Sequence, residues 1–242
     1  MVCYAFMPQR LLLLTGAFEA GILAPHLAKQ GEDCAIRPVD SLEKLEAALA
    51  EPAGTTRLLS FCTSVIVPRR VLALLPGPSY NIHPGPPSFP GRHPESWGAY
   101  RGVRNFGATL HEMAPRVDEG AIVDVCWFEP AERAGQMEFG FGAFRAALQL
   151  VLRWAVALTG DDAPLPHSEH RWSGHKTTHA ELEAMCRIGP EIEAAEFDRR
   201  RRAFAEQPGS RMVLILHGRD FVYTAPTPPK PVVEFSPAKA EG

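Results

Sequence analysis

The sequence predicts an α/β fold in which helices cover both faces of an open, mostly parallel, doubly wound sheet. Short apolar segments typical of strands alternate with segments of helical periodicity over residues 10–83. The chain has 242 residues, of which 45% are hydrophobic and 22% charged, so it can bury a real core. This length suits one full α/β domain with an appendage, or two small domains.

Periodicity and end signals place the individual elements. Ser41 is a predicted N-cap for a helix over residues 42–50, and Pro68 begins a helix that ends near residue 75. The other predicted helices are 18–30, 95–101, 139–158, 180–186 and 192–204, and the predicted strands are 10–16, 34–39, 57–62, 79–83, 107–113 and 122–128. The helix 139–158 is expected to turn one face into the core, carrying Phe141, Phe144, Leu148, Val151 and Leu152.

Changes in composition divide the chain into three parts. Residues 1–158 are expected to form the α/β domain. Residues 159–225 are expected to form an extension with a polar surface loop (159–178), two helices and a β-hairpin turning at His217–Asp220. Residues 226–242 are rich in proline and lysine, which predicts a disordered tail or one draped on the surface.

Charge and cysteine usage narrow the functional classes. The net charge of −3 argues against a general nucleic-acid-binding or anionic-membrane surface. The apolar run Leu11–Leu14 is far shorter than a membrane span, and Arg10 follows the apolar N-terminal residues, the reverse of a secretory signal. The five cysteines are scattered and never in CxxC spacing, which indicates reduced thiols in the cytoplasm.

The most informative segment is residues 80–91, Tyr-Asn-Ile-His-Pro-Gly-Pro-Pro-Ser-Phe-Pro-Gly. Asn81 and His83 end an apolar segment and precede a Pro/Gly loop, where an α/β sheet presents its chemistry. With Asp118 downstream, an amide, an imidazole and a carboxylate can hold a carbonyl oxygen, move a proton and orient the ring. Taken alone, Asn81 and His83 also fit polar residues that satisfy a strand end, and Asp118-Glu119-Gly120 an ordinary turn.

The ordered set of motifs from about Leu58 to Phe128 resembles the 10-formyltetrahydrofolate-dependent formyltransferases. This family includes the N-terminal domain of methionyl-tRNA formyltransferase, glycinamide ribonucleotide formyltransferase and the amino-sugar N-formyltransferases. The resemblance implies the Rossmann-like formyltransferase fold and an enzyme that uses 10-formyltetrahydrofolate as formyl donor without a metal. The motifs that carry it are an apolar strand, a Pro-initiated helix, Asn81-Ile82-His83-Pro84, Gly107-Ala108-Thr109-Leu110-His111 and Asp118-Glu119-Gly120-Ala121-Ile122.

The same resemblance implies a role for each matching residue. Asn81 would donate a hydrogen bond to the formyl oxygen, and His83 would stabilise the oxyanion and take part in proton transfer. Asp118 would pair with His83 and, through water, help to remove the proton of the amine. His111 and Thr109 would be secondary residues of the site. The folate pocket would be formed by the segment Cys62–Ile66 and the loop Ala114–Val117, with Ser64, Val65, Ile66, Ala114, Arg116 and Val117.

The chain departs from the common family pattern on the acceptor side. That pattern continues after His-Pro with Ser-Leu-Leu-Pro, whereas here Gly85–Gly91 intervenes before Trp97. The tRNA-formylating enzymes carry a sizeable basic C-terminal barrel, and only about 40 residues follow Arg202 here. We therefore expect the acceptor to be a small-molecule primary amine, such as an amino sugar or an amino acid derivative. A homodimer is left open, and neither a membrane nor a nucleic acid is expected as partner.

Three alternatives remain at this stage. A formyltetrahydrofolate hydrolase would use the same three residues on water, but such enzymes carry an N-terminal regulatory domain, whereas the first strand here begins at Arg10. A hydrogenase-maturation-type relative would strip the one-carbon unit, usually within a longer two-module chain. A non-catalytic folate-binding or partner-binding module would keep the site without turnover.

Other motifs favour structural interpretations. His167, His170, His175 and His179 lie in a polar segment without the regular structure of most zinc sites, which favours a solvated loop. The run Arg199–Arg202 points around a helix, which favours a solvated helix end. The turn at Thr15-Gly16 lacks the GxGxxG pattern, which argues against a dinucleotide cofactor.

Overall fold

The computed structural model describes residues 9–31, 33–160, 163–206 and 212–224. The strands of its large sheet are β1 (Gln9–Leu14), β2 (Cys34–Val39), β3 (Thr56–Phe61), β4 (Tyr80–His83), β5 (Phe106–Glu112) and β6 (Ile122–Phe128). The helices are α1 (Ala17–Ala28), α2 (Leu42–Ala50), α3 (Arg69–Leu72), α4 (Pro94–Arg101), α5 (Gln136–Thr159), α6 (His179–Cys186) and α7 (Ala194–Phe204). A small sheet contains β7 (Arg187–Ile188), β8 (Val213–Leu216) and β9 (Arg219–Val222).

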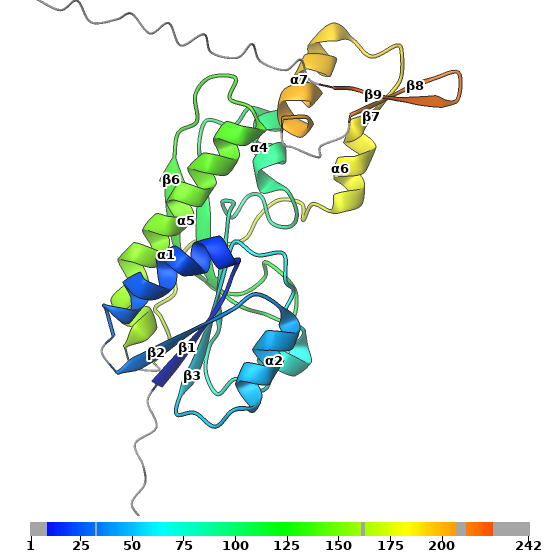
Figure 1. Cartoon of the computed structure of the whole chain (residues 1–242). Helices are drawn as coiled ribbons and strands as arrows, with labels where there is room; N and C mark the ends of the chain where they lie inside the picture. The colour runs from blue at the N-terminus through cyan, green and yellow to red at the C-terminus, as the bar shows by residue number, and fades with distance from the viewer. Residues whose placement is uncertain (1–8, 32, 161–162, 207–211, 225–242) are drawn as a thin grey trace, which may run out of the picture.

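The large sheet has the order β2-β1-β3-β4-β5-β6 (Figure 1). Strands β2, β1, β3 and β4 are parallel, β5 runs antiparallel to β4, and β6 runs antiparallel to β5. The predicted mostly parallel α/β sheet is therefore confirmed. The pairing of β4 with β5 places Asn81 opposite His111 and His83 opposite Thr109, so two motifs distant in sequence meet across one strand pair.

Both faces of the sheet are covered, which explains why every residue of β3 and all but the first residue of β1 are buried. Successive side chains of a strand point to opposite faces. On β1, Leu11 and Leu13 therefore pack in the core beneath α1 and α5, whereas Leu12 and Leu14 pack beneath α2 and α3. Helices cover both sides, so the sheet is doubly wound. The loops that follow its parallel strands lie at the carboxyl edge of the sheet.

The predicted core face of α5 was partly wrong. Phe141 is 67% exposed and Leu152 is 56% exposed. Small residues let the buried side approach the sheet closely, since a Cβ added at Gly142 would lie 2.2 Å from the ring of Phe128. Among the described residues, α5 is the one helix whose length and apolar composition would suffice to cross a membrane. It packs against β5 and β6 as a core helix. Its buried side carries Phe139, Ala143, Ala146, Ala147, Leu150, Val151, Ala155 and Leu158.

The C-terminal elements lie beyond α4 (Figure 1). The ring of Phe204 on α7 lies 5.4 Å from that of Trp97 on α4. The predicted hairpin is present, but its turn is only His217-Gly218, both in the left-handed region that two-residue hairpins require. Strand β7, which pairs with β8, was not predicted because two residues show no periodicity. The predicted tail, 226–242, lies outside the described residues, and the division at residues 158 and 225 stays a prediction.

Candidate active site

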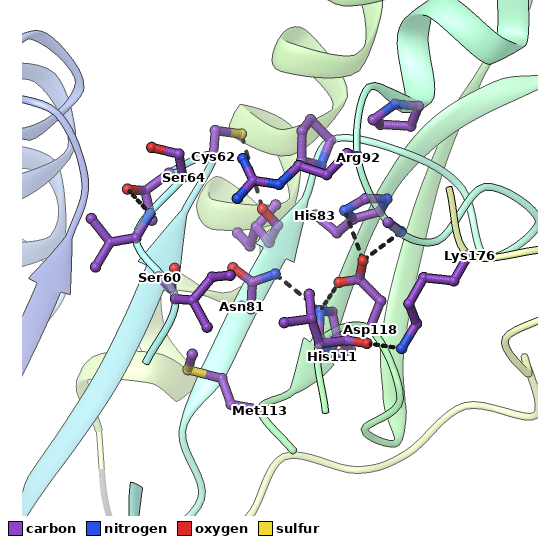
Figure 2. A pocket seen from close by; sticks show the side chains of 18 of the residues that line it. Ser60, Cys62, Ser64, Asn81, His83, Arg92, His111, Met113, Asp118 and Lys176 are labelled. Carbon is purple, nitrogen blue, oxygen red and sulfur yellow. Dashed lines mark hydrogen bonds and ion pairs between the residues drawn. The ribbon is translucent and has the colours of Figure 1, made fainter. Parts of the chain in front are cut away.

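A cavity of about 480 Å³ opens at the carboxyl ends of β3 and β4. Ligands of open α/β sheets bind at this edge, where loops leave neighbouring strands. The loops after β3 and β5 and the last residues of β4 form much of its wall. Figure 2 shows Asn81, His83, His111 and Asp118 pointing toward one another inside it. The structure therefore brings the predicted residues Asn81, His83 and Asp118 together with His111, which was predicted as a secondary residue of the site.

Asn81 and His111 are joined across the β4–β5 pair. Asn81 Nδ2 lies 3.0 Å from His111 Nε2, and His111 Nδ1 lies 2.7 Å from the carbonyl oxygen of Glu112. A carbonyl oxygen only accepts, so Nδ1 carries the proton and Nε2 of the neutral ring accepts from Asn81, an assignment made from the hydrogen-bond network. This bond uses one N–H of the Asn81 amide and sets its orientation. The second N–H points elsewhere and can donate to a ligand.

Burial keeps His111 neutral. The residue is 2% exposed, and removal from solvent lowers its pKa to about 4, although the nearby carboxylate of Asp118 partly opposes the shift. At neutral pH the ring therefore lacks a second proton, which is what the bond from Asn81 requires. His111 holds Asn81 in place as a hydrogen-bond acceptor.

The lowered pKa of His111 predicts a loss of stability in mild acid. Below pH 6.5, the ordinary pKa of histidine, His111 of the unfolded chain binds a proton. In the folded protein the ring stays unprotonated until about pH 4. The free energy of unfolding should therefore decrease as the pH falls from the unfolded to the folded pKa of His111, by on the order of a few kcal/mol. Below the folded pKa, His111 should cause no further decrease. Urea unfolding at a series of pH values should show a shallower decrease in His111→Gln. An identical pH dependence in both proteins would contradict the prediction.

His83 and Asp118 form the buried centre of the site. His83 Nε2 lies 2.9 Å from the carbonyl oxygen of Phe89, and Nδ1 lies 3.7 Å from Asp118 Oδ2. The amide of Gly91 donates to the same Oδ2 over 2.8 Å. Asp118 Oδ1 lies 3.6 Å from His111 Nε2 and has no hydrogen-bond partner among the described residues. The carboxylate is thus held by one oxygen and leaves the other for a water or a ligand.

The predicted folate-pocket residues line the same cavity. They come from the loops after β3 and β5, the two neighbours of β4 in the sheet. Thr109 is different, because it is fully buried and absent from the wall, and its hydroxyl donates to the carbonyl oxygen of Gly85 over 2.7 Å. Thr109 therefore supports the loop after His83 from beneath. The wall contains Ser64, Val65, Ile66, Ala114, Arg116 and Val117.

The prediction that residues 159–178 form a solvated surface loop was wrong for their last part. Lys176, Thr177 and Thr178 line the cavity, and the indole of Trp172 lies against the His111 ring with centroids 4.9 Å apart. The composition of this segment is polar, and the signals that could have indicated packing are its apolar residues Leu165 and Trp172. Arg92, His93 and Glu95, which follow the proline-rich loop, also line the cavity without having been predicted.

The four histidines of the predicted loop separate in space. His167 pairs with Glu112, His175 with Glu181, and His179 with His93. Within the described part of the chain, no group of three His, Cys, Asp or Glu side chains is arranged to hold a metal ion.

Cys62 borders the cavity. Burial raises the pKa of its thiol well above the usual range. A cysteine nucleophile must act as the thiolate, which this environment disfavours. The site is therefore suited to direct transfer between two ligands rather than to a covalent thioester.

Comparison with known proteins agrees with the motifs. Residues 37–129, which include Asn81, His83, His111 and Asp118, match the formyl transferase family model. A sugar N-formyltransferase from Shewanella sp. FDAARGOS_354 superposes with a TM-score of 0.72 at 13% identity, covering 90% of this chain and 97% of that one. At this low sequence identity, the superposition shows a shared fold and not a shared function.

Two further structures contain folate. HypX from Aquifex aeolicus in complex with tetrahydrofolic acid matches with a TM-score of 0.55 at 20% identity, over 89% of this chain and 37% of that chain. The formyltransferase PseJ from Anoxybacillus kamchatkensis, in complex with UDP-4,6-dideoxy-4-formamido-L-AltNAc and tetrahydrofolate, matches with a TM-score of 0.55 at 16% identity, over 73% and 88%. The segment that contains every converging side chain therefore matches the formyl transferase family, and the chain shares the fold of a sugar N-formyltransferase.

Proposed function

We propose that this protein transfers a formyl group from 10-formyltetrahydrofolate to a primary amine on a small molecule. The observation that carries the proposal is the convergence of Asn81, His83 and Asp118 on one cavity within the family-matched segment. These residues supply a hydrogen-bond donor, an imidazole and a carboxylate, and burial raises the pKa of the Cys62 thiol, which disfavours a covalent thioester intermediate.

The geometry supports direct attack of the amine on the formyl carbon. The carbon–nitrogen bond forms first and gives a tetrahedral oxyanion, to which the second N–H of Asn81 donates. One such donor is worth about 3 kcal/mol in a preorganised site. The amine loses a proton through water to the free Oδ1 side of Asp118. His83 supplies a proton to the departing folate nitrogen and is reprotonated by Asp118, so both residues return to their starting states. The bond to that nitrogen then breaks, and tetrahydrofolate and the formamide leave.

The folate would lie between the loops after β3 and β5. Ile66 and Val117 are 56% and 46% exposed although they are apolar, and both border the cavity. An aromatic ring system that covered them would remove apolar surface from water. Backbone groups of the same loops would supply the polar contacts that orient the ring.

The acceptor that we propose is a nucleotide-linked amino sugar. A structural neighbour is bound to a UDP-linked 4-formamido sugar, and another is a sugar N-formyltransferase. The formamide of such a sugar is the product of formyl transfer to its 4-amino precursor. Residues of the acceptor side would come from the segment after the proline-rich loop and from Lys176–Thr178.

The test is incubation of the protein with 10-formyltetrahydrofolate and a panel of amines. The panel contains UDP- and dTDP-linked 4-amino-4,6-dideoxy sugars, amino acid derivatives and an amine-free control. Tetrahydrofolate release would be followed spectroscopically and the formamide by mass spectrometry. Release that requires an amino sugar is the expected result. Release without any amine would indicate a hydrolase, and no release with any amine would indicate a folate-binding or partner-binding module.

A further inference from the structure

We infer that residues 172–178, here called the strap, position the carboxylate of Asp118 for the transfer reaction. Lys176 and Thr177 are its main positioning residues. The inference rests on the proposed function for its kinetic consequence, but the contacts themselves are independent of it. The strap lies outside the family-matched segment, since that match ends at residue 129 and helix α5 lies between.

The strap holds the loop of Asp118 on both sides. Lys176 Nζ donates to the carbonyl oxygen of Val117 over 2.6 Å and to Glu119 Oε1 over 2.8 Å. Trp172 Nε1 donates to the carbonyl oxygen of Gly120 over 2.8 Å. Asp118 itself has a φ of 53°, in the left-handed region that costs a non-glycine residue about 1 kcal/mol or more. Bonds to both flanking residues help to keep it in that conformation, and Figure 2 shows Lys176 beside Asp118.

The strap also holds the donor that orients the carboxylate. Thr177 pairs with Gly91 as a parallel bridge: its amide donates to the carbonyl oxygen of Pro90 over 3.0 Å, and its own carbonyl accepts from the amide of Arg92 over 2.9 Å. The Thr177 hydroxyl donates to the carbonyl oxygen of Arg92 over 2.6 Å. Gly91 lies between these bonds, with its amide aimed at Asp118 Oδ2.

Gly91 has to be glycine for this contact. Its φ is 96°, and a Cβ added there would lie 2.3 Å from the carbonyl oxygen of Thr177. The close approach of strap and loop therefore fixes both the position and the direction of the Gly91 amide. A shift of the strap would move the carboxylate through this amide and through the Val117–Gly120 loop together.

Trp172, from the same segment, packs against two histidine rings of the site. Its ring is edge-on to His83, with centroids 5.8 Å apart, and to His111, at 4.9 Å. The two buried imidazoles thus pack against one indole. Exclusion of water strengthens electrostatic interactions inside such a site.

The strap contributes little to the apolar core. No residue of 172–178 belongs to the three clusters of buried apolar side chains found in the described residues. Changes in its polar contacts should therefore affect the rate of the chemical step more than the stability of the fold.

The kinetic test compares variants that remove the hydrogen-bond donors of Lys176 and Thr177 with variants that keep them. In Lys176→Met and Thr177→Val we expect kcat to fall by about 10–100-fold, because displacement of a reacting group by about 1 Å can cost that much. The KM for 10-formyltetrahydrofolate should stay near that of the natural protein. Lys176→Arg and Thr177→Ser keep the donors and should recover most of the rate. Lys44→Met removes a lysine with a similar ion pair, to Asp40, away from the cavity and should leave kcat unchanged.

A second measurement tests the positioning role of the strap without depending on the proposed function. The amide proton of Gly91 should resonate downfield in NMR spectra because it donates to a carboxylate, and should move upfield in Thr177→Val and Lys176→Met without any turnover. An unchanged Gly91 amide, or an unchanged kcat in both variants, would overturn the inference. If the natural protein releases no tetrahydrofolate, the proposed function fails while the amide shift still decides the positioning. If Thr177→Val does not fold, the half-exposed Lys176 decides the result alone.

Discussion

His83→Ala is expected to lower kcat for formyl transfer by roughly 1,000-fold, within the range that a general acid–base residue contributes. An oxygen acceptor lies near each ring nitrogen of His83, Phe89 O at 2.9 Å and Asp118 Oδ2 at 3.7 Å. This arrangement suits a ring that carries a proton and returns it within one catalytic cycle. Stopped-time assays with 10-formyltetrahydrofolate and the best acceptor of the panel would measure the loss.

The matched control for His83→Ala is His170→Ala. His170 is exposed and contacts the edge of Trp127 rather than the cavity, so its removal should leave kcat unchanged. Added imidazole should restore part of the rate to His83→Ala, because the space left by the ring is buried at the site. A rate within a few-fold of the natural protein in His83→Ala would remove His83 from the mechanism.

Asp118→Asn is expected to lower kcat by about 100- to 1,000-fold while the fold remains intact. Asparagine has nearly the same shape, tolerates the left-handed conformation of residue 118 and can still accept from the Gly91 amide. It lacks the negative charge that accepts the proton of the amine in the proposed mechanism. The loss should therefore appear in kcat, with the melting temperature nearly unchanged.

Asp40→Asn provides the control for a lost carboxylate. Asp40 pairs with Lys44 on the surface, where one ion pair contributes little, and its removal should change neither kcat nor folding. If Asp118→Asn instead raised the melting temperature strongly and kept its rate, Asp118 would be a residue of the fold and not of the reaction.

The main elements of the domain follow from local sequence. Strand β2, helix α2 and strand β6 begin and end at the predicted residues, because alternating apolar segments and a capping serine are local signals. The Ser41 hydroxyl accepts from the amide of Lys44 as predicted. Helix α5 shows the limit, since the side with small residues packs closest to the sheet while Phe141 is left exposed. Apolar content alone does not tell which of two apolar faces fits a given neighbour.

The sequence motifs by themselves predicted that Asn81, His83 and Asp118 meet in one site. Strand order does not place Asp118 there, because β5 is antiparallel to β4 and its last residue, Glu112, lies opposite Tyr80 at the start of β4. Only the tertiary structure decided how they are held: His111 is kept neutral by burial and orients Asn81, and the strap fixes Gly91 and the loop of Asp118. These contacts join residues more than 25 positions apart through single hydrogen bonds. Such bonds depend on distance in space and leave no period in the sequence, so the polar segment 172–178 resembled a free loop until its packing was known.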